Sequence, residues 1–228
     1  MKAKVLVGCP TSEHKEYCLN EYIDAVKGLS YDNYDILLVD NSETDRYCNK
    51  IKSLGINVIK DKYLERARDR IVNSRNIIRE YALNNGYDYF LSLEQDVIPP
   101  KDIIERLLRH EKDIVSGVYF TKYFINGAFE IKPLLWVNKE GFVSLQFIDD
   151  DSVKKEKLIR VDACGLGCIL IKKDILEKVR FRLFPDKSTF DDMPFCKDLN
   201  DKKIQIYSDT SIKCKHLISG MDWEKIKE

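Results

Sequence analysis

The sequence lacks an excess of charge of either sign. Its 228 residues include 38 Lys and Arg residues and 38 Asp and Glu residues, so the formal net charge is zero. Proteins that bind nucleic acid through its phosphates carry a basic face or arm, and no local run of this chain resembles one. The composition therefore argues against a nucleic-acid partner.

Long hydrophobic runs are also missing near the first residue. The apolar run at residues 5–9 is too short for a signal-peptide core or a membrane span, which predicts a cytoplasmic protein. The seven cysteines are odd in number and scattered, so we expect reduced core residues and no disulfide framework. Repeats, low-complexity tracts and a clear linker are absent as well. We therefore expect a single domain over residues 1–228.

The two common glycine-rich phosphate loops are absent from the start of the chain. Neither a P-loop nor a dinucleotide-binding fingerprint follows the apolar run at residues 5–9. This absence disfavours P-loop and dinucleotide-dependent enzymes. It also weakens the alternative of a nucleotidyltransferase, which would be expected to carry a Gly- and Lys/Arg-rich triphosphate loop at this position.

The first two thirds of the chain alternate between strand-like and helix-like segments. Buried strands are predicted at residues 5–9, 35–39, 57–60, 89–96 and 113–120. Helical spacing lies between them, at residues 16–29, 64–83 and 101–110. This alternation predicts an α/β fold with a mostly parallel sheet and helices on both faces.

The second half has a less regular pattern. We predict a small β-ribbon from residues 129–137 and 141–148, with a turn at residues 138–141 and a charged loop at residues 149–157. Strand character returns at residues 158–172 and 204–216, and helices are predicted at residues 173–179 and 193–199. Trp223 and Ile226 lie on a predicted short helix that would dock on the body, on a partner or on a membrane surface.

Two carboxylates stand at the end of the predicted strand at residues 89–96. Alternate residues of a strand point to one side, so Glu94 and Asp96 could converge on one ion. Mg²⁺ and Mn²⁺ bind through a few carboxylates plus substrate phosphates, which suits this position. His216 ends an apolar inward face and could be a third ligand. The alternatives are solvated acids at a strand end and a histidine with a structural role in the core.

Three further charged side chains need partners or tasks. Arg75 falls at the edge of the apolar stripe of its helix, where an unpaired guanidinium would be costly. A protein carboxylate, the Glu94–Asp96 pair and a ligand phosphate all remain open as its partner. Asp191 and Asp192 stand at a predicted helix start and serve either as caps or as a general base. Adjacent ionised acids repel, which raises one pKa and favours the second role.

Small polar residues follow the first two predicted strands. Pro10 and Thr11 follow the first strand, and Asp40 and Asn41 follow the second. Neighbouring parallel strands that end this way form a crevice suited to a base and a ribose. The same residues also serve as ordinary turn and helix-cap residues, so local sequence leaves both readings open.

In this order, the motifs resemble those of the GT-A fold glycosyltransferases that use nucleotide sugars, most closely the family-2-like group. The resemblance covers nearly the whole chain. Pro10-Thr11 and residues 37–42 resemble that family's nucleotide-binding opening, and Ser74-Arg75-Asn76 resembles its donor-side helix motif. Glu94-Gln95-Asp96 resembles its DXD motif, whose last acid binds the metal that bridges the donor diphosphate.

The later motifs fit the same family. Gly165-Leu166-Gly167 resembles the turn that lines the sugar site, and His216 has the position of a late metal-binding histidine. Residues 190–196 resemble the segment in which the second of two acids is the base of inverting enzymes. Glu94 replaces the usual first Asp, and Asp191 replaces a more usual Glu.

The resemblance implies a metal-dependent glycosyltransferase with an inverting mechanism. It would use a nucleotide-sugar donor and a hydroxyl of a saccharide, lipid or protein acceptor. Mn²⁺ or Mg²⁺ would bind Asp96 and His216, with Glu94 contacting either the metal or the sugar and ribose. Asp192 would be the base, with Asp191 as the alternative.

The same resemblance divides the chain into two halves. Residues 1–120 would form the nucleotide-binding half and residues 121–228 the acceptor-side half. The remaining alternative is a non-catalytic protein that binds nucleotide sugars.

Overall fold

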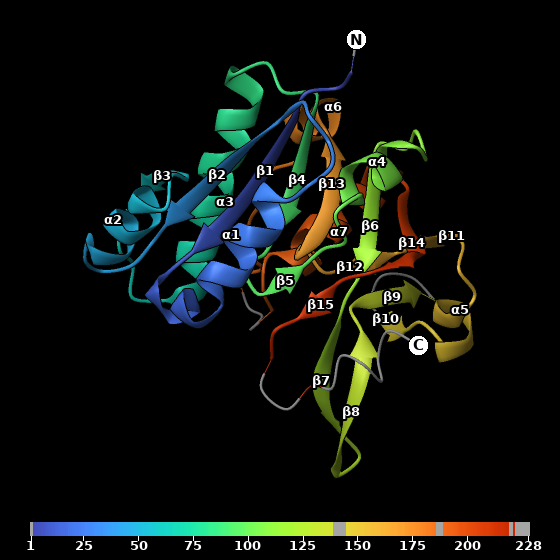
Figure 1. Cartoon of the computed structure of the whole chain (residues 1–228). Coiled ribbons are helices and arrows are strands. Elements are labelled where there is room, and N and C mark those ends of the chain that lie inside the picture. The colour runs from blue at the N-terminus through green and yellow to red at the C-terminus, as the bar shows by residue number, and fades with distance from the viewer. Residues whose placement is uncertain (1, 139–144, 186–188, 219–220, 222–228) are drawn as a thin grey trace.

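An eight-stranded sheet runs through the described part of the protein (Figure 1). The structure is a computed structural model that describes residues 2–138, 145–185, 189–218 and 221. The sheet has the strand order β11-β14-β6-β13-β4-β1-β2-β3. Its strands are β1 (Val5–Thr11), β2 (Tyr34–Asp40), β3 (Asn57–Lys60), β4 (Tyr89–Leu93), β6 (Ile114–Val118), β11 (Leu158–Val161), β13 (Cys168–Lys172) and β14 (Ile206–Lys213).

The pairing of these strands is mostly parallel, as predicted. β1 pairs in parallel with β2 and β4, β2 pairs in parallel with β3, and β14 pairs in parallel with β6. β13 is the exception at the centre, because it runs antiparallel to both β4 and β6. Its insertion places the chain that precedes Cys168 beside the carboxyl end of β4.

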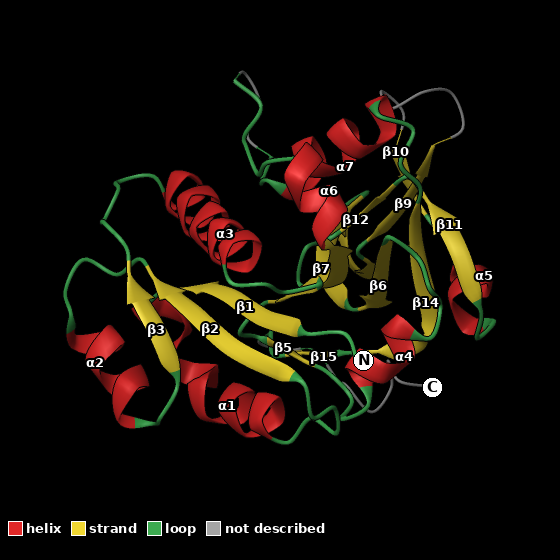
Figure 2. Cartoon of the chain, turned by 90° about the horizontal axis from the view of Figure 1, so that it is seen from above, coloured by secondary structure: helices red, strands yellow, loops and turns green. Residues whose placement is uncertain are grey.

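Helices cover both faces of the sheet (Figure 2). One face packs on α1 (Leu19–Lys27), α2 (Arg46–Ser53) and α4 (Ile103–Leu108), and the 3-10 helix η1 (Glu13–Cys18) precedes α1. The other face packs on α3 (Ala67–Asn84), α6 (Lys173–Lys178) and α7 (Asp192–Asp201). The spacing of Leu19, Tyr22, Ile23 and Val26 explains α1, since all four side chains are buried on one stripe. The predicted α/β fold with helices on both faces is confirmed.

Three small sheets accompany the eight-stranded sheet in the described residues. β5 (Val97–Ile98) pairs with β15 (Lys215–His216), and β9 (Leu135–Asn138) lies between β10 (Leu145–Phe147) and β12 (Ala163–Cys164). β7 (Phe120–Ile125) and β8 (Ala128–Pro133) form a hairpin that projects from the body in Figure 1. Its turn at Asn126 and Gly127 has positive φ angles of 50° and 85°, which Asn and Gly tolerate best.

Two sequence predictions in this half were wrong in detail. The strand predicted at residues 129–137 is divided between β8, which forms a hairpin with β7, and β9. The predicted antiparallel pairing with residues 141–148 is confirmed only for β9, which pairs with β10. The charged segment at residues 149–157 is not all loop, because α5 (Asp150–Lys154) begins where the Asp149 carboxylate accepts a hydrogen bond from the Ser152 amide at 2.8 Å. Residues 139–141 of the predicted turn, and all of the predicted tail helix except residue 221, lie outside the described residues.

The strand predicted at residues 89–96 is shorter than expected. β4 ends at Leu93, and the chain then turns, with the Val97 amide donating to the Glu94 carbonyl at 2.9 Å. The register explains the early end, because β1 pairs only as far as Ser92 and β13 only as far as Leu93. The inference that Glu94 and Asp96 share one side of a strand was therefore wrong, since both follow the strand.

None of the helices in the described residues combines the length and the apolar character that crossing a membrane requires. The cytoplasmic location stays a prediction from the sequence.

Close packing at Gly8 gives the first testable prediction. A Cβ atom at this position would stand 2.5 Å from Ile78 Cγ2 and 2.7 Å from Phe90 Cε2, so Gly8→Ala overpacks the contact between β1 and α3. We expect a loss of about 1–3 kcal/mol in the free energy of unfolding, measured by urea denaturation. Combining Gly8→Ala with Ile78→Ala should cost less than the sum of the single changes, because the new methyl enters the space that Ile78 vacates. Additive costs would contradict this steric account.

Candidate active site

A pocket of about 550 Å³ opens at the edge of the sheet where parallel strands β1, β2 and β4 end. Carboxyl ends of parallel strands are the usual ligand-binding edge of an α/β sheet. Nine of the residues singled out in the sequence line this pocket: Pro10, Thr11, Asn41, Arg75, Glu94, Asp96, Asp191, Asp192 and His216. The fold thus gathers motifs from both ends of the chain in one place.

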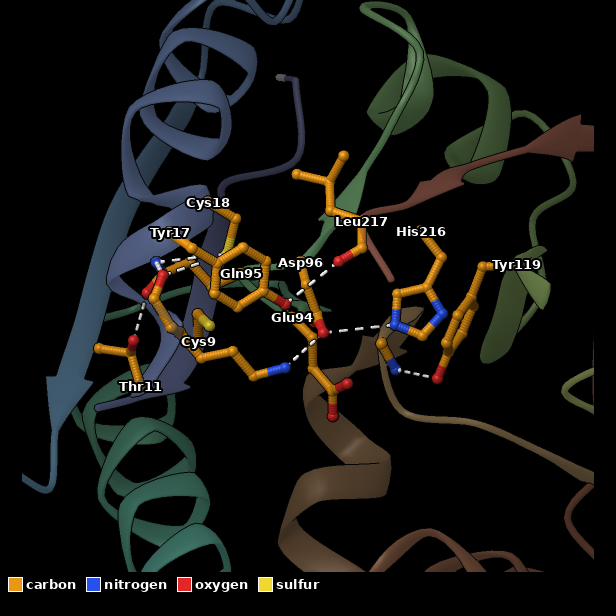
Figure 3. Close-up of polar contacts among 12 residues, drawn as sticks. Cys9, Thr11, Tyr17, Cys18, Glu94, Gln95, Asp96, Tyr119, His216 and Leu217 are labelled. Atoms are coloured by element: carbon orange, nitrogen blue, oxygen red, sulfur yellow. Dashed lines mark hydrogen bonds and ion pairs between the residues drawn. The ribbon is translucent and has the colours of Figure 1, made fainter. Parts of the chain in front are cut away.

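Asp96 lies at the meeting point of three segments. Its Oδ2 atom forms an ion pair with the Lys15 ammonium of η1. The same atom lies 3.3 Å from His216 Nε2 (Figure 3). Burial alone would raise the pKa of Asp96, but the contacts with His216 and Lys15 lower it to about 2. The side chain is only 7% exposed. Asp96 is therefore a buried carboxylate that stays ionised.

The backbone around Asp96 is tied to the same segments. Gln95 is buried, and its side-chain amide donates to the Lys15 carbonyl at 2.6 Å. Its Oε1 atom accepts from the hydroxyls of Thr11 and Tyr47. On the other side, the Leu217 amide donates to the Asp96 carbonyl at 2.8 Å. Gln95 thus connects the turn formed by Glu94-Gln95-Asp96 to β1 and to η1.

His216 presents a defined nitrogen to Asp96. Its Nδ1 atom lies 2.7 Å from the Phe120 carbonyl oxygen, which can only accept, so Nδ1 carries a proton. Nε2 is left facing Asp96. The Tyr119 ring packs edge-on against the imidazole, with centroids 5.3 Å apart. The hydrogen bond and the ring contact fix the orientation of the imidazole.

Arg75 is the most deeply buried charge of the site, at 1% exposure. Its guanidinium donates to Asp191 Oδ2 at 2.8 Å, to Ser92 Oγ at 2.6 Å and to Glu94 Oε1 at 3.1 Å. Of the three partners that the sequence left open, the structure places two beside Arg75: a protein carboxylate, Asp191, and one member of the Glu94–Asp96 pair. Glu94 and Asp96 consequently take different partners, although they are only two residues apart.

The two adjacent acids have opposite environments. Asp191 is buried and paired with Arg75, whereas the Asp192 carboxylate accepts only a backbone hydrogen bond, from the Met193 amide at 2.8 Å, among the contacts described. Burial and the negative charge of Asp191 raise the pKa of Asp192 to about 7. Of the two, Asp192 is therefore the carboxylate that can exchange a proton near neutral pH.

The polar residues after the first two strands divide into lining and supporting residues. Asn41 lines the pocket and donates to Ser74 Oγ at 3.1 Å, which links it to α3. Asp40 does not line the pocket. It is fully buried, and its Oδ1 atom accepts from the amide and hydroxyl of Ser42. Its Oδ2 atom has no hydrogen-bond partner within the described part of the chain.

The glycines of the Gly165-Leu166-Gly167 turn make room for a tyrosine. A Cβ atom on Gly167 would stand 2.6 Å from Tyr119 Cζ, and the Gly167 amide donates to the Tyr119 hydroxyl at 2.9 Å. Only Leu166 of the three lines the pocket. Both glycines therefore act through Tyr119, which in turn packs on His216.

A metal ion would find few protein ligands here. Among the described residues, no group of three His, Cys, Asp or Glu side chains is spaced to hold one. Asp96 and His216 are adjacent, while Glu94 is held by Arg75. The Asp96 Oδ1 atom is buried and has no hydrogen-bond partner within the described residues. Two protein ligands fit Mg²⁺ or Mn²⁺, which commonly keep few carboxylate ligands and complete their shell with phosphates and water.

Sequence reasoning missed Lys15 and Tyr119. Lys15 is one of 38 basic residues, and no pattern around it separates it from surface lysines. Tyr119 lies at the end of a buried strand, where an aromatic residue is ordinary core material. Only their position beside Asp96 and His216 gives them significance.

Comparison with known proteins supports the same assignment. The family model described as "Glycosyl transferase family 2" matches residues 12–180. The chain belongs to glycosyl transferase family 2. It is therefore a transferase enzyme. Among curated protein sequences, no significant match is found.

Solved structures share the fold of this family 2 member at low sequence identity. Similar chains include A197 from STIV (17% identity, TM-score 0.51, 95% of this chain and 86% of that chain). GalNAc-T7 with UDP, GalNAc and Mn²⁺ has 12% identity and a TM-score of 0.69, over 94% of this chain and 44% of that chain. The mannosyltransferase PcManGT from Pyrobaculum calidifontis, in complex with GDP-Man and Mn²⁺, has 13% identity and a TM-score of 0.64, over 99% of this chain and 60% of that chain.

These similarities show a GT-A fold. The chain spans less than two thirds of the length of GalNAc-T7 and of PcManGT.

The opposite environments of the adjacent acids predict opposite effects on stability. The pKa of Asp192 is about 7 in the folded protein and near 3.9 in the unfolded chain. The folded state therefore binds this proton more tightly, and the contribution of the proton to the free energy of unfolding is complete below about pH 4 and is lost as the pH rises to about 7. Asp192→Asn should therefore raise the free energy of unfolding at pH 8 by about 2–4 kcal/mol and have little effect at pH 4.

Asp191→Asn is the matched change. It removes a buried partner of Arg75 and should destabilise the protein by about 3–5 kcal/mol at pH 8. Urea denaturation at both pH values measures the two effects. Equal effects of the two substitutions would contradict the assigned environments.

Proposed function

We propose that the protein transfers a sugar from a nucleoside-diphosphate sugar to an acceptor hydroxyl, with inversion at the anomeric carbon, and that it requires Mn²⁺ or Mg²⁺. The observation that carries the proposal is the difference between the environments of Asp191 and Asp192. Arg75 holds Asp191 in an ion pair, and Asp192 remains as a pocket-lining carboxyl group with a pKa of about 7. A general base works best when its pKa lies near the working pH.

Asp192 would accept the proton of the acceptor hydroxyl as the oxygen attacks the anomeric carbon. The bond between that carbon and the leaving nucleoside diphosphate breaks as the new glycosidic bond forms. Since Asp192 lines the pocket at the amino end of α7, we place the acceptor on this side. Arg75 would keep Asp191 from competing for the same proton.

Asp96 and His216 would hold the divalent cation. The free Oδ1 atom of Asp96 and the Nε2 atom of His216 are the available donors, and the Phe120 carbonyl fixes the imidazole tautomer. When bound, the cation acts as a Lewis acid that stabilises the negative charge of the leaving diphosphate. The Mn²⁺ in the complexes of GalNAc-T7 and PcManGT supports this part of the proposal.

Thr11 and Asn41 would contact the nucleoside, because they line the pocket at the ends of β1 and β2. The UDP bound to GalNAc-T7 and the GDP-Man bound to PcManGT support a nucleotide-sugar donor. A saccharide, a lipid and a protein remain candidates for the acceptor.

Substitution of the proposed base gives a direct test. Asp192→Asn should lower kcat about 100-fold or more and leave the affinity for the nucleoside diphosphate nearly unchanged. In the unchanged enzyme, kcat/KM should fall about tenfold per pH unit below pH 7, because Asp192 is then protonated. Steady-state kinetics over pH 5–9 measure both effects, once a donor and acceptor pair is found.

Asp198→Asn provides the control for this test. Asp198 lies on the same helix but is paired with Arg182 at 2.6 Å, outside the pocket. This variant should keep its activity and pH profile. Full activity of Asp192→Asn would show that the base has been assigned to the wrong residue.

Ligand-dependent stability tests the donor and the metal together. We expect UDP or GDP to raise the melting temperature by several degrees with Mn²⁺ and by less with EDTA, because ligands that bind only the folded state stabilise it. Asp96→Asn should lose the Mn²⁺-dependent part of the shift. Asp32→Asn, which removes an exposed acid paired with Lys2, should keep it. No Mn²⁺-dependent shift with either nucleotide would refute the proposed metal dependence.

A further inference from the structure

Lys15 occupies one of the two oxygens that Asp96 could offer a cation. Its ammonium forms an ion pair with the Asp96 Oδ2 atom, which His216 Nε2 also approaches at 3.3 Å. Lys15 and Asp96 both line the pocket. The proposed cation ligand thus already carries a positive partner supplied by the chain itself.

This contact is part of a built arrangement. The Lys15 amide donates to the Ser12 carbonyl at 2.8 Å, and the Lys15 carbonyl accepts from Gln95 Nε2 at 2.6 Å. Gln95 directly precedes Asp96, so hydrogen bonds fix the backbone on both sides of the ion pair. The Lys15 side chain is 38% exposed, whereas that of Asp96 is only 7% exposed, so the lysine is the less confined of the two partners.

The charges around the pocket explain why Asp96 requires Lys15 as a partner. Asp191 and Glu94 share the guanidinium of Arg75. Asp96, in contrast, has no arginine partner among the described contacts, and a buried carboxylate without a cation is unfavourable. The Lys15 ammonium supplies this cation at the Asp96 Oδ2 atom.

We propose that Lys15 is a tethered counterion that competes with the divalent cation for Asp96, and that the donor diphosphate relieves this competition by accepting the ammonium. The inference rests on the proposed function of this pocket. A divalent cation and an ammonium repel each other at the same carboxylate, so Lys15 weakens metal binding on its own. A diphosphate in the pocket gives the displaced ammonium a new anionic partner, so metal and nucleotide bind with strong positive coupling.

Coupling of this kind is reciprocal and can be measured from both sides. The titration of free Mn²⁺ by electron paramagnetic resonance gives the affinity for the metal, with UDP or GDP present or absent. Calorimetry with UDP and GDP in EDTA and in Mn²⁺ gives the affinity for the nucleotide. Neither readout depends on catalytic turnover.

Lys15→Met removes the charge and keeps an unbranched apolar chain. In the absence of nucleotide, we expect this variant to bind Mn²⁺ about tenfold more tightly than the unchanged protein. This corresponds to a difference of about 1.4 kcal/mol in the free energy of binding. In EDTA it should bind UDP or GDP more weakly. The factor by which nucleotide improves Mn²⁺ affinity should shrink accordingly.

Two control variants separate charge competition from other effects. Lys15→Arg keeps the positive charge and should retain weak Mn²⁺ binding in the absence of nucleotide. Lys50→Gln removes a lysine that pairs with Glu16 of η1 at 2.7 Å, outside the pocket, and should behave like the unchanged protein. Circular dichroism verifies the fold of each variant, and Lys15→Gln replaces Lys15→Met should the latter not fold.

The outcomes distinguish this inference from the proposed function. Equal Mn²⁺ affinity of Lys15→Met and the unchanged protein would overturn the role of Lys15, while nucleotide-dependent Mn²⁺ binding in both would leave the proposed function standing. Tighter Mn²⁺ binding by Lys50→Gln as well would also overturn it, because the effect would then be general. Absence of Mn²⁺ binding in every variant, with and without UDP or GDP, would overturn both.

Discussion

The buried guanidinium of Arg75 is the interaction on which the geometry of the site depends. It reaches from α3 to the end of β4 and to the start of α7, where it contacts Ser92, Glu94 and Asp191. Removing such a charge from water is costly unless each donor finds an acceptor. Because these acceptors lie on segments far apart in the sequence, Arg75 forces the two halves of the chain into one arrangement. Other positions of Glu94 and Asp191 would leave it unpaired.

A consequence of this pairing is that like charges in one pocket acquire different properties. Asp191 and Glu94 share the single positive charge of Arg75, and Asp96 pairs with Lys15 and lies beside His216. Asp192 receives no comparable side-chain partner among the described contacts, and its pKa rises to about 7 through burial and the charge of Asp191. The pocket thus holds one carboxylate that stays ionised, Asp96, and one that can exchange a proton near neutral pH, Asp192. A carboxyl group with a pKa near neutral beside one that is ionised is what general-base chemistry requires.

Much of the fold could be predicted because its signals are local. The strand at residues 57–60 has the predicted bounds, and β1, β2, α1 and α3 differ from prediction by a few residues at their ends. Apolar spacing determines these elements directly. The errors occur where distant contacts decide. β4 stops at Leu93 because its neighbours β1 and β13 no longer pair beyond it, and the predicted strand at residues 129–137 divides because β7 and β12 pair with different parts of it.

For the site, the sequence alone determined the chemical types and their order: acids after the fourth strand of the parallel unit, an arginine beside the core, an acidic pair and a late histidine. Together with the family match, this order identifies a glycosyltransferase. Tertiary structure decided which side chains meet. It paired Arg75 with Asp191, so that Asp192 is the acid whose pKa rises, and it placed Lys15 on Asp96. The physical reason is that charge pairing depends on distances between segments that are remote in sequence, whereas spacing along the chain reports only which face of one strand or helix a residue occupies.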